Sequence, residues 1–161
     1  MNKSISKIVL RNPIHLLSFG FGSGLSPKAP GTMGTIVAIP IFLAICEFTL
    51  SLYLLVVVLI FLIGCWTSGK TAKALKVHDH PGIVIDEIAG YLITMIMVPI
   101  TWYWVILGFL FFRLFDIWKP WPISIIDKQV KGGFGIMLDD VLAALYSLLS
   151  LHIVIWSVKF L

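Results

Sequence analysis

Charged residues are scarce in this chain. Lysine, arginine, aspartate and glutamate together make up 12% of the 161 residues, whereas hydrophobic residues make up 59%. Soluble domains carry about 25% charged residues, and the mean hydropathy here is +1.02. The composition therefore excludes an ordinary soluble domain and predicts an all-α integral membrane protein.

Other familiar signals are also missing. The chain has two cysteines, Cys46 and Cys65, which lie within or beside apolar runs and are expected to be buried, inert thiols. Cysteine and histidine are not arranged for a zinc site, and neither a Walker motif nor a dinucleotide fingerprint is present. No small-residue cleavage pattern follows the first segment, so we expect no cleaved signal peptide. We expect no nucleic-acid partner.

The chain is expected to form one domain, residues 1–161, with three parts. Residues 1–19 are an N-terminal segment, residues 20–35 form a Gly/Pro-rich cytoplasmic loop, and residues 36–161 form a helical bundle. Three basic residues of the first part recur at four-residue spacing, which favours an interfacial helix lying among lipid headgroups. A flexible basic tail is an equal alternative. The three residues are Lys3, Lys7 and Arg11.

The helical part has room for about four to five transmembrane helices of about 20 residues each. Residues 36–66 would be about 46 Å long as one helix, so two short crossings with a turn at 46–49 fit a bilayer better. The other predicted crossings are 83–100, 105–115 and 135–158, separated by loops at 67–82 and 119–134.

Charge is placed unevenly along this predicted topology. Eleven of the twelve Lys and Arg residues fall on one membrane face, and Lys159 alone lies at the far end. By the positive-inside rule, the shared face is cytoplasmic. Seven of the eight acids, all but Glu47, fall on the same face. The positive-inside rule does not require acids to gather there, so their position needs another cause.

Three acidic clusters lie near the predicted cytoplasmic helix ends. Ionisable residues within membrane segments are rare and usually face a cavity, a partner or an ion. Gathered at one surface, these carboxylates would repel one another, and a divalent cation would remove that repulsion. Because hard oxygen ligands suit Mg²⁺, we predict a magnesium site with catalytic carboxylates. The predicted ligands and catalytic residues are Asp86, Glu87, Asp116, Asp139 and Asp140.

The alternative is that basic neighbours neutralise these acids. Arg113, Asp116 and Lys119 are successively three residues apart, so neighbouring members can pair on a helix. Lys128 and Lys131 offer further partners. Pairing alone leaves the two acidic doublets unexplained.

Groups suited to phosphate surround the acids in this reading. Arg grips phosphate through two parallel hydrogen bonds and Lys acts as a point charge. Residues 30–35 fall at a predicted helix N-terminus, where free N–H groups attract anions. Spacing alone does not favour anion binding there over a simple loop and helix cap. Carboxylates, a metal and a basic rim suit phosphoryl chemistry, with an Asp as general base or nucleophile. The predicted phosphate-binding residues are Lys28, Thr32, Gly34, Thr35, Arg113 and Lys119.

Two histidines, His78 and His80, flank Asp79 in the loop before Pro81. A phosphohistidine route is conceivable, but no partner for it is evident in the sequence. We favour a supporting role or ordinary loop histidines.

Four blocks, in this order and spacing, resemble the bacterial phosphatidylglycerophosphatase A family. The resemblance implies a multi-pass enzyme of the bacterial inner membrane with its active site facing the cytoplasm. Its substrate would be an anionic phospholipid, phosphatidylglycerophosphate, hydrolysed with Mg²⁺ at the terminal phosphomonoester to phosphatidylglycerol and phosphate. The five acids named above would be its acidic motif positions. The blocks are GFGSGLSPKAPGTMGT (20–35), VHDHPGIVIDEIAG (77–90), FRLFDIWKPWPI (112–123) and GGFGIMLDDVLAA (132–144).

Two other functions stay open at this point. The same carboxylates could serve a membrane transporter for divalent cations or protons, because intramembrane acids also mark ion pathways. A non-catalytic scaffold subunit would carry the polar clusters for structural reasons only. The oligomeric state and the number of metal ions are left open.

Overall fold

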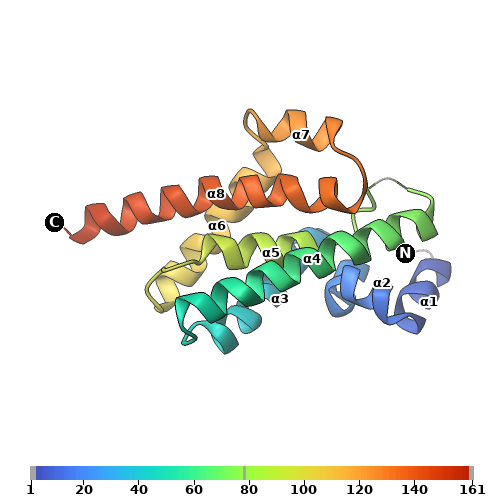
Figure 1. Ribbon diagram of the computed structural model, residues 1–161, viewed down its shortest axis with the longest axis horizontal. Coiled ribbons are helices and arrows are strands. Elements are labelled where there is room, and N and C mark those ends of the chain that lie inside the picture. Colours follow the sequence, from blue (N-terminus) through green and yellow to red (C-terminus); the bar gives the residue numbers. More distant parts are fainter. Residues whose placement is uncertain (1–2, 78, 160–161) are drawn as a thin grey trace.

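The computed structural model describes residues 3–77 and 79–159. Within these residues the chain forms helices and no strand, which confirms the all-α prediction. Figure 1 shows them in sequence colours. The helices are α1 (Lys3–Arg11), α2 (Pro13–Ser18), the 3-10 helix η1 (Gly20–Leu25), α3 (Pro30–Ile45), α4 (Leu50–Leu75), α5 (Ile85–Thr94), α6 (Trp102–Trp118), α7 (Ile123–Gln129) and α8 (Gly132–Lys159).

Helix α5 is the centre of the bundle and packs against α3, α4, α6 and α8. Eight of its ten residues are buried, and the other two are Asp86 and Glu87. Its small residues let neighbours approach closely: a Cβ added to Gly90 would lie 2.5 Å from the Phe112 ring of α6. This helix therefore carries the two acids of its first turn into the middle of the fold.

Two helices of the described residues, α4 and α8, are long and apolar enough to cross a membrane by length and composition. This is fewer than the four to five predicted. Helix α3 is apolar but shorter, with 16 residues. Figure 1 shows α4 and α8 running along the long axis, so that the end of α4 and the start of α8 lie at the same end of the molecule.

Several predicted boundaries differ from the structure. The turn at 46–49 is confirmed, because α3 ends at Ile45 and α4 begins at Leu50. The predicted crossing 83–100 is wrong in extent, since α5 ends at Thr94 and a non-helical segment with Met97 at φ 57° follows. The predicted loop 67–82 begins too early. Helix α4 continues to Leu75 because small polar residues there, such as Thr67 and Ser68, are buried against the rest of the protein.

Two predicted loops contain helices. The Gly/Pro-rich segment 20–35 includes η1, and α3 already begins at Pro30, a residue type suited to a first helical position. The predicted loop 119–134 contains α7. The N-terminal segment is helical as α1 and α2 rather than a flexible tail, and His15 of α2 hydrogen-bonds to Thr71 of α4 at 2.9 Å.

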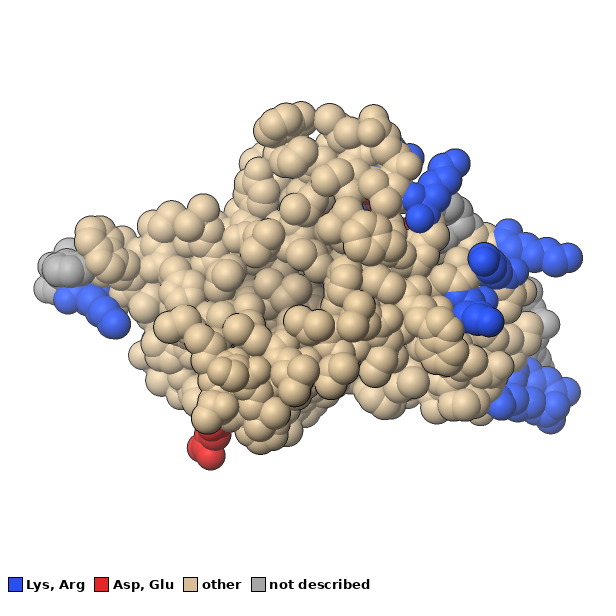
Figure 2. Space-filling model, in the orientation of Figure 1, with Lys and Arg blue, Asp and Glu red and all other residues tan. Residues whose placement is uncertain are grey.

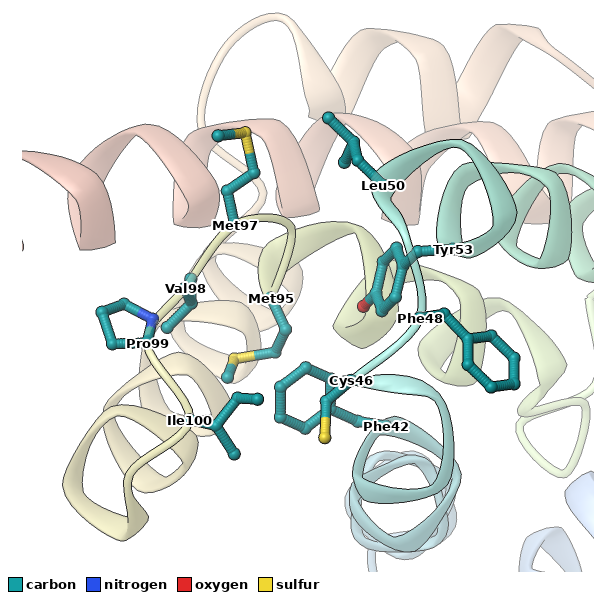
Figure 3. A pocket seen from close by; sticks show the side chains of 10 residues that line it. All are labelled: Phe42, Cys46, Phe48, Leu50, Tyr53, Met95, Met97, Val98, Pro99 and Ile100. Atoms are coloured by element: carbon teal, nitrogen blue, oxygen red, sulfur yellow. The ribbon is translucent and has the colours of Figure 1, made fainter.

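The two ends of the bundle differ in charge. In Figure 2, Lys and Arg side chains gather at the end where the N-terminal helices, the end of α4 and the start of α8 lie. We call this the charged end. Lys159, in the last turn of α8, lies at the other end. There, an apolar hollow of about 420 Å³ lies between the α3–α4 turn and residues 95–100 (Figure 3).

Candidate active site

A cleft of about 370 Å³ opens at the charged end, and we call it the acidic cleft. The first residues of α3, the loop before α5, the end of α6 and the start of α8 surround it. The structure brings the five predicted acids together here from three helices that are distant in sequence. The charged residues that line it are Asp79, Asp86, Glu87, Arg113, Asp116, Lys119, Asp139 and Asp140.

Three of these carboxylates form a close group, the carboxylate triad of Asp86, Glu87 and Asp140. One oxygen from each lies within 4.8 Å of the others. Each side chain also has a buried oxygen without a hydrogen-bond partner among the described residues, namely Oδ1 of Asp86, Oε2 of Glu87 and Oδ2 of Asp140. Buried carboxylates without a counter-charge are strongly destabilising. Oxygen ligands alone suit Mg²⁺, Ca²⁺ or Mn²⁺ rather than zinc, so the triad fits the predicted metal.

The other two predicted ligands face cations instead. Asp139 accepts a hydrogen bond from Lys119 Nζ at 2.5 Å, and Asp116 pairs with Arg113 at 2.5 Å. Asp139 and Asp140 are neighbours on α8, and successive helical side chains point about 100° apart. Asp139 therefore faces Lys119 at the end of α6, while Asp140 faces Asp86 and Glu87. The predicted set of five thus divides into a triad, of which Glu87 has a longer ion pair with Arg113 at 3.8 Å, and two acids in close ion pairs.

Lys119 reaches the cleft from the end of α6. Its backbone is left-handed, with φ 43° and ψ 61°, a common conformation for the residue that ends a helix. Its ammonium lies 2.9 Å from Asp127 of α7 as well as contacting Asp139. Burial alone would lower the pKa of Lys119, but the two carboxylates outweigh it and raise the pKa above its ordinary value.

Asp127 was not predicted as a site residue. In the sequence it stands in a stretch interpreted as a loop, eight residues beyond Lys119. Only the short helix α7 turns it back towards the cleft. The predicted pairing of Asp116 with Lys119 is replaced by the contacts of Lys119 with Asp127 and Asp139. The sequence offered one indication of its role, because Asp127 lies between two basic residues, Lys119 and Lys128.

Arg113 lies between two acids, 2.5 Å from Asp116 and 3.8 Å from Glu87. The start of α3 closes this side of the cleft. A Cβ added to Gly31 would lie 2.1 Å from Oε1 of Glu87 and 3.1 Å from Nη1 of Arg113. Glycine is therefore needed for Glu87 to approach. The positive end of the α3 dipole consequently faces a carboxylate of the protein itself.

The other predicted phosphate-binding residues do not line the acidic cleft. Thr35 is fully buried and its hydroxyl donates to the Gly31 carbonyl at 3.0 Å. Gly34 packs against Val84, from which an added Cβ would be 2.7 Å away. Thr32 lies in the first turn of α3 and Lys28 is exposed in the loop before it. Of the predicted phosphate ligands, Arg113 and Lys119 line the cleft.

Two histidines of the loop before α5 were predicted to have a supporting role or none. His78 is outside the described residues. His80 accepts a hydrogen bond from the Gly82 N–H through Nδ1 at 3.0 Å and lines a neighbouring hollow rather than the acidic cleft.

Comparison with protein families gives a match to the family described as phosphatidylglycerophosphatase A, over residues 16–155. The chain belongs to this family. The family predicted from the four sequence blocks is therefore confirmed, and members of the phosphatidylglycerophosphatase A family are named for a phosphatase activity.

Curated relatives agree with this membership. Phosphatidylglycerophosphatase A of Escherichia coli is 49% identical over 143 residues, covering 88% of this chain and 83% of the relative. That of Haemophilus influenzae is 42% identical over 161 residues, covering 99% and 96%. A protein of Bacteroides thetaiotaomicron, provisionally named a phosphatidylinositol-3-phosphatase, is 39% identical over 151 residues, covering 89% and 94%. No solved structure matches the chain.

Proposed function

We propose that this chain hydrolyses the terminal phosphomonoester of phosphatidylglycerophosphate to phosphatidylglycerol and phosphate, with Mg²⁺, in the bacterial inner membrane. The observation that carries the proposal is the carboxylate triad. Within residues 3–77 and 79–159 its one ion pair is that of Glu87 with Arg113, at 3.8 Å. The names of the Escherichia coli and Haemophilus influenzae relatives supply the substrate.

Exposed apolar side chains support the membrane location. Helix α4 exposes leucine and valine on much of its surface, including Leu55 at 53% and Leu62 at 57%, and α8 exposes Leu149 and Trp156. At 1.5 Å per residue, α4 would be about 39 Å long, more than a bilayer core of about 30 Å. We propose that α4 and α8 cross the bilayer and that α3, α5 and α6 lie beside them, which makes a multi-pass bundle.

Charge supports the orientation. The basic side chains gather at the end that holds the acidic cleft (Figure 2), and Lys and Arg favour the cytoplasmic side. The cleft would then open among the headgroups of the cytoplasmic leaflet. An anionic lipid could bring its terminal phosphate there without leaving the membrane.

Asp86, Glu87 and Asp140 would hold the magnesium ion, because their oxygens converge and lack other partners. When bound, Mg²⁺ would offset the negative charge of the phosphate and make a coordinated water more acidic. The triad also needs a rigid support. Asp86 and Glu87 lie in the first turn of α5, whose next residues are buried in the core.

Arg113 and Lys119 would bind the phosphate oxygens, since both line the cleft and present donors beside the triad. Arg113 also has a buried Nε without a hydrogen-bond partner among the described residues. In the reaction, the oxygen of water bonds to phosphorus and the bond from phosphorus to the glycerol oxygen breaks. Asp116, which pairs with Arg113, would accept the proton of water, and the glycerol oxygen would take up a proton as it leaves.

The transporter alternative predicts acids along the depth of the bundle. The acids of the described residues instead gather in the acidic cleft and its rim, apart from Glu47 in the α3–α4 turn. This arrangement favours chemistry at a surface over passage through the bundle.

The test is phosphate release by the purified protein from phosphatidylglycerophosphate, phosphatidate and phosphatidylinositol 3-phosphate, with Mg²⁺ and with EDTA. We expect release from the first lipid to be fastest and EDTA to abolish it. Cation flux in liposomes without phosphate release from any lipid would contradict the proposal. Phosphate release that is unaffected by EDTA would contradict the proposed dependence on Mg²⁺.

A further inference from the structure

A second hollow, of about 320 Å³, adjoins the acidic cleft. We call it the side hollow. It lies between α1, η1 with the loop that follows, and residues 80–82. Pro30 and Pro81 line both spaces, so the side hollow and the acidic cleft meet at these two residues. A ligand anchored in the cleft can therefore extend into the side hollow.

His80 supplies a fixed hydrogen-bond donor in this hollow. Its Nδ1 accepts the N–H of Gly82 at 3.0 Å, and its ring packs against Phe19 with a centroid separation of 5.5 Å. A Cβ added to Gly82 would lie 2.4 Å from the Phe19 ring, so glycine lets this packing form. Because Nδ1 is the acceptor, the neutral ring carries its proton on Nε2. No partner for Nε2 occurs among the described residues.

The protonation state agrees with this tautomer. Burial lowers the pKa of His80 below its ordinary value, although Asp79 opposes the shift. Near neutral pH the ring is therefore mainly neutral, with one N–H directed away from the Gly82 contact. The ring can donate a hydrogen bond from Nε2 but carries no full charge.

A basic residue lies in the loop that borders the side hollow, although it is not one of the lining residues. Lys28 is exposed in the loop between Pro27 and Pro30, and both prolines line the side hollow. The Ser26 hydroxyl donates to the Lys28 carbonyl at 2.8 Å, which fixes the backbone of this turn. Among the described residues Lys28 makes no ion pair. Its ammonium is thus free to face an anion.

We propose that the side hollow binds the phosphodiester of the substrate, with Lys28 as its counter-charge and His80 Nε2–H as its hydrogen-bond donor. This rests on the proposed function. Phosphatidylglycerophosphate carries two phosphates joined by one glycerol, and the structure has two adjoining spaces with cationic or donor groups. The phosphomonoester would lie in the acidic cleft, the glycerol would cross Pro30 and Pro81, and the phosphodiester would reach the side hollow.

In this proposal the acidic cleft carries out the reaction and the side hollow contributes only to substrate binding. Residues of the acidic cleft act on the phosphomonoester, whereas Lys28 and His80 bind a group that does not react. Interactions with a non-reacting group that are equal in the ground state and the transition state change KM without changing kcat. A lipid whose only phosphate is a phosphomonoester would gain nothing from them.

The test compares Lys28→Gln and His80→Asn with the unaltered protein in mixed micelles at a fixed lipid mole fraction and saturating Mg²⁺. Asn at position 80 retains an acceptor oxygen for the Gly82 N–H and removes the Nε2 donor, so the turn can persist. Lys73→Gln is the control, because Lys73 is an exposed lysine near the end of α4 that lines neither space. It reports any general loss of attraction to anionic micelles.

We expect each variant to raise KM for phosphatidylglycerophosphate about tenfold, the usual scale for losing one hydrogen bond to a charged group, with kcat unchanged. Inhibition by inorganic phosphate, which probes the acidic cleft alone, should keep its inhibition constant, and inhibition by phosphatidylglycerol should weaken. The proposal is overturned if KM stays constant, if Lys73→Gln raises it equally, or if phosphate inhibition weakens in parallel. Absence of phosphate release by the unaltered protein would instead overturn the proposed function.

Discussion

The acidic cleft and the apolar hollow lie at opposite ends of one bundle and differ in charge and in hydrogen bonding. In the cleft, buried carboxylate oxygens lack partners. In the hollow no lining residue is charged, and the Tyr53 hydroxyl donates to the Leu92 carbonyl at 2.7 Å. Figure 3 shows that hydroxyl beside Phe42, Met95 and other apolar side chains. The hydroxyl in the hollow thus has a partner within the protein, whereas the carboxylate oxygens in the cleft lack one among the described residues.

Helix α5 joins the two ends. Its first turn carries Asp86 and Glu87, and its later residues enter the core, where Tyr91 packs edge-on against Phe42 at 6.2 Å. The Tyr91 hydroxyl donates to the Val105 carbonyl at 3.1 Å. The packing and hydrogen bond of Tyr91 thereby hold in place the helix that carries the two carboxylates. Substitutions in the cleft should change activity, and substitutions near the hollow should change stability.

The largest effect is expected for Asp140→Asn, which removes one charge of the carboxylate triad. We expect phosphate release to fall by about 10³-fold, the upper range for loss of one electrostatic contact to the reacting group. Folding should persist, because the substitution relieves repulsion among buried like charges. Thermal denaturation with and without Mg²⁺ checks the cause. At a hundred times its Kd, Mg²⁺ should stabilise the unaltered protein by about 2.7 kcal/mol and the variant far less.

The matched control is Glu47→Gln, which removes the exposed acid of the α3–α4 turn. It should change neither phosphate release nor stabilisation by Mg²⁺. Equal loss in both variants would mean that the total negative charge matters and the triad does not.

The next effect is expected for Gly31→Ala, which should lower phosphate release about 10²-fold. The new Cβ would lie 2.1 Å from Oε1 of Glu87 and would displace that carboxylate, and small misplacements of reacting groups cost about this much. Gly69→Ala in α4 is the control, since its Cβ would meet only Gly133 at 3.4 Å. Equal activity of the two variants would show that Glu87 has no part in the reaction.

A smaller effect is expected for Lys119→Gln. The change removes the cation between Asp127 and Asp139, so kcat/KM for the lipid should fall about tenfold, in line with one charged hydrogen bond. Inorganic phosphate should inhibit the variant less strongly. Lys128→Gln, at an exposed lysine of α7, should leave both values unchanged. Unaltered phosphate inhibition in Lys119→Gln would leave Lys119 with a structural role only.

The smallest effect is expected at the apolar end, for Tyr53→Phe. Loss of the hydrogen bond to Leu92 should lower the free energy of unfolding by about 1 kcal/mol, measured by thermal or denaturant unfolding in detergent. KM and kcat should stay constant, because Tyr53 lies outside both the cleft and the side hollow. A changed KM would mean that the two ends are coupled through α5.

Much of this site could be predicted from the sequence. Acids in an apolar chain are costly, so Asp86, Glu87, Asp116, Asp139 and Asp140 stood out as one set without a structure, and the four sequence blocks indicated the family. The pairing of acids with bases could not be predicted. Lys119 is three residues from Asp116 but contacts Asp127 and Asp139 instead, because its left-handed backbone and helix α7 redirect it.

Helix lengths were also poorly predicted. Hydropathy indicated one long crossing at 83–100, yet α5 ends at Thr94. In α4 the opposite occurred, since the helix continues through Thr67 and Thr71, whose buried hydroxyls have hydrogen-bond partners, although the polar sequence had suggested that it would stop. Hydropathy reports only whether a residue is apolar. It does not report whether a polar side chain finds a partner inside the protein.

The sequence by itself determined that the protein is all-α and that its basic residues gather at one end. It also determined that the same end holds more acids than simple pairing explains. Composition and residue order already contain these properties. Only the tertiary structure decided which carboxylates remain without a cation. Asp139 and Asp140 are adjacent and chemically identical, but they point about 100° apart on α8. Helices α6 and α7 pack on one side of α8, where Lys119 contacts Asp139. Helix α5 packs on another side, where Asp140 lies beside Asp86 and Glu87.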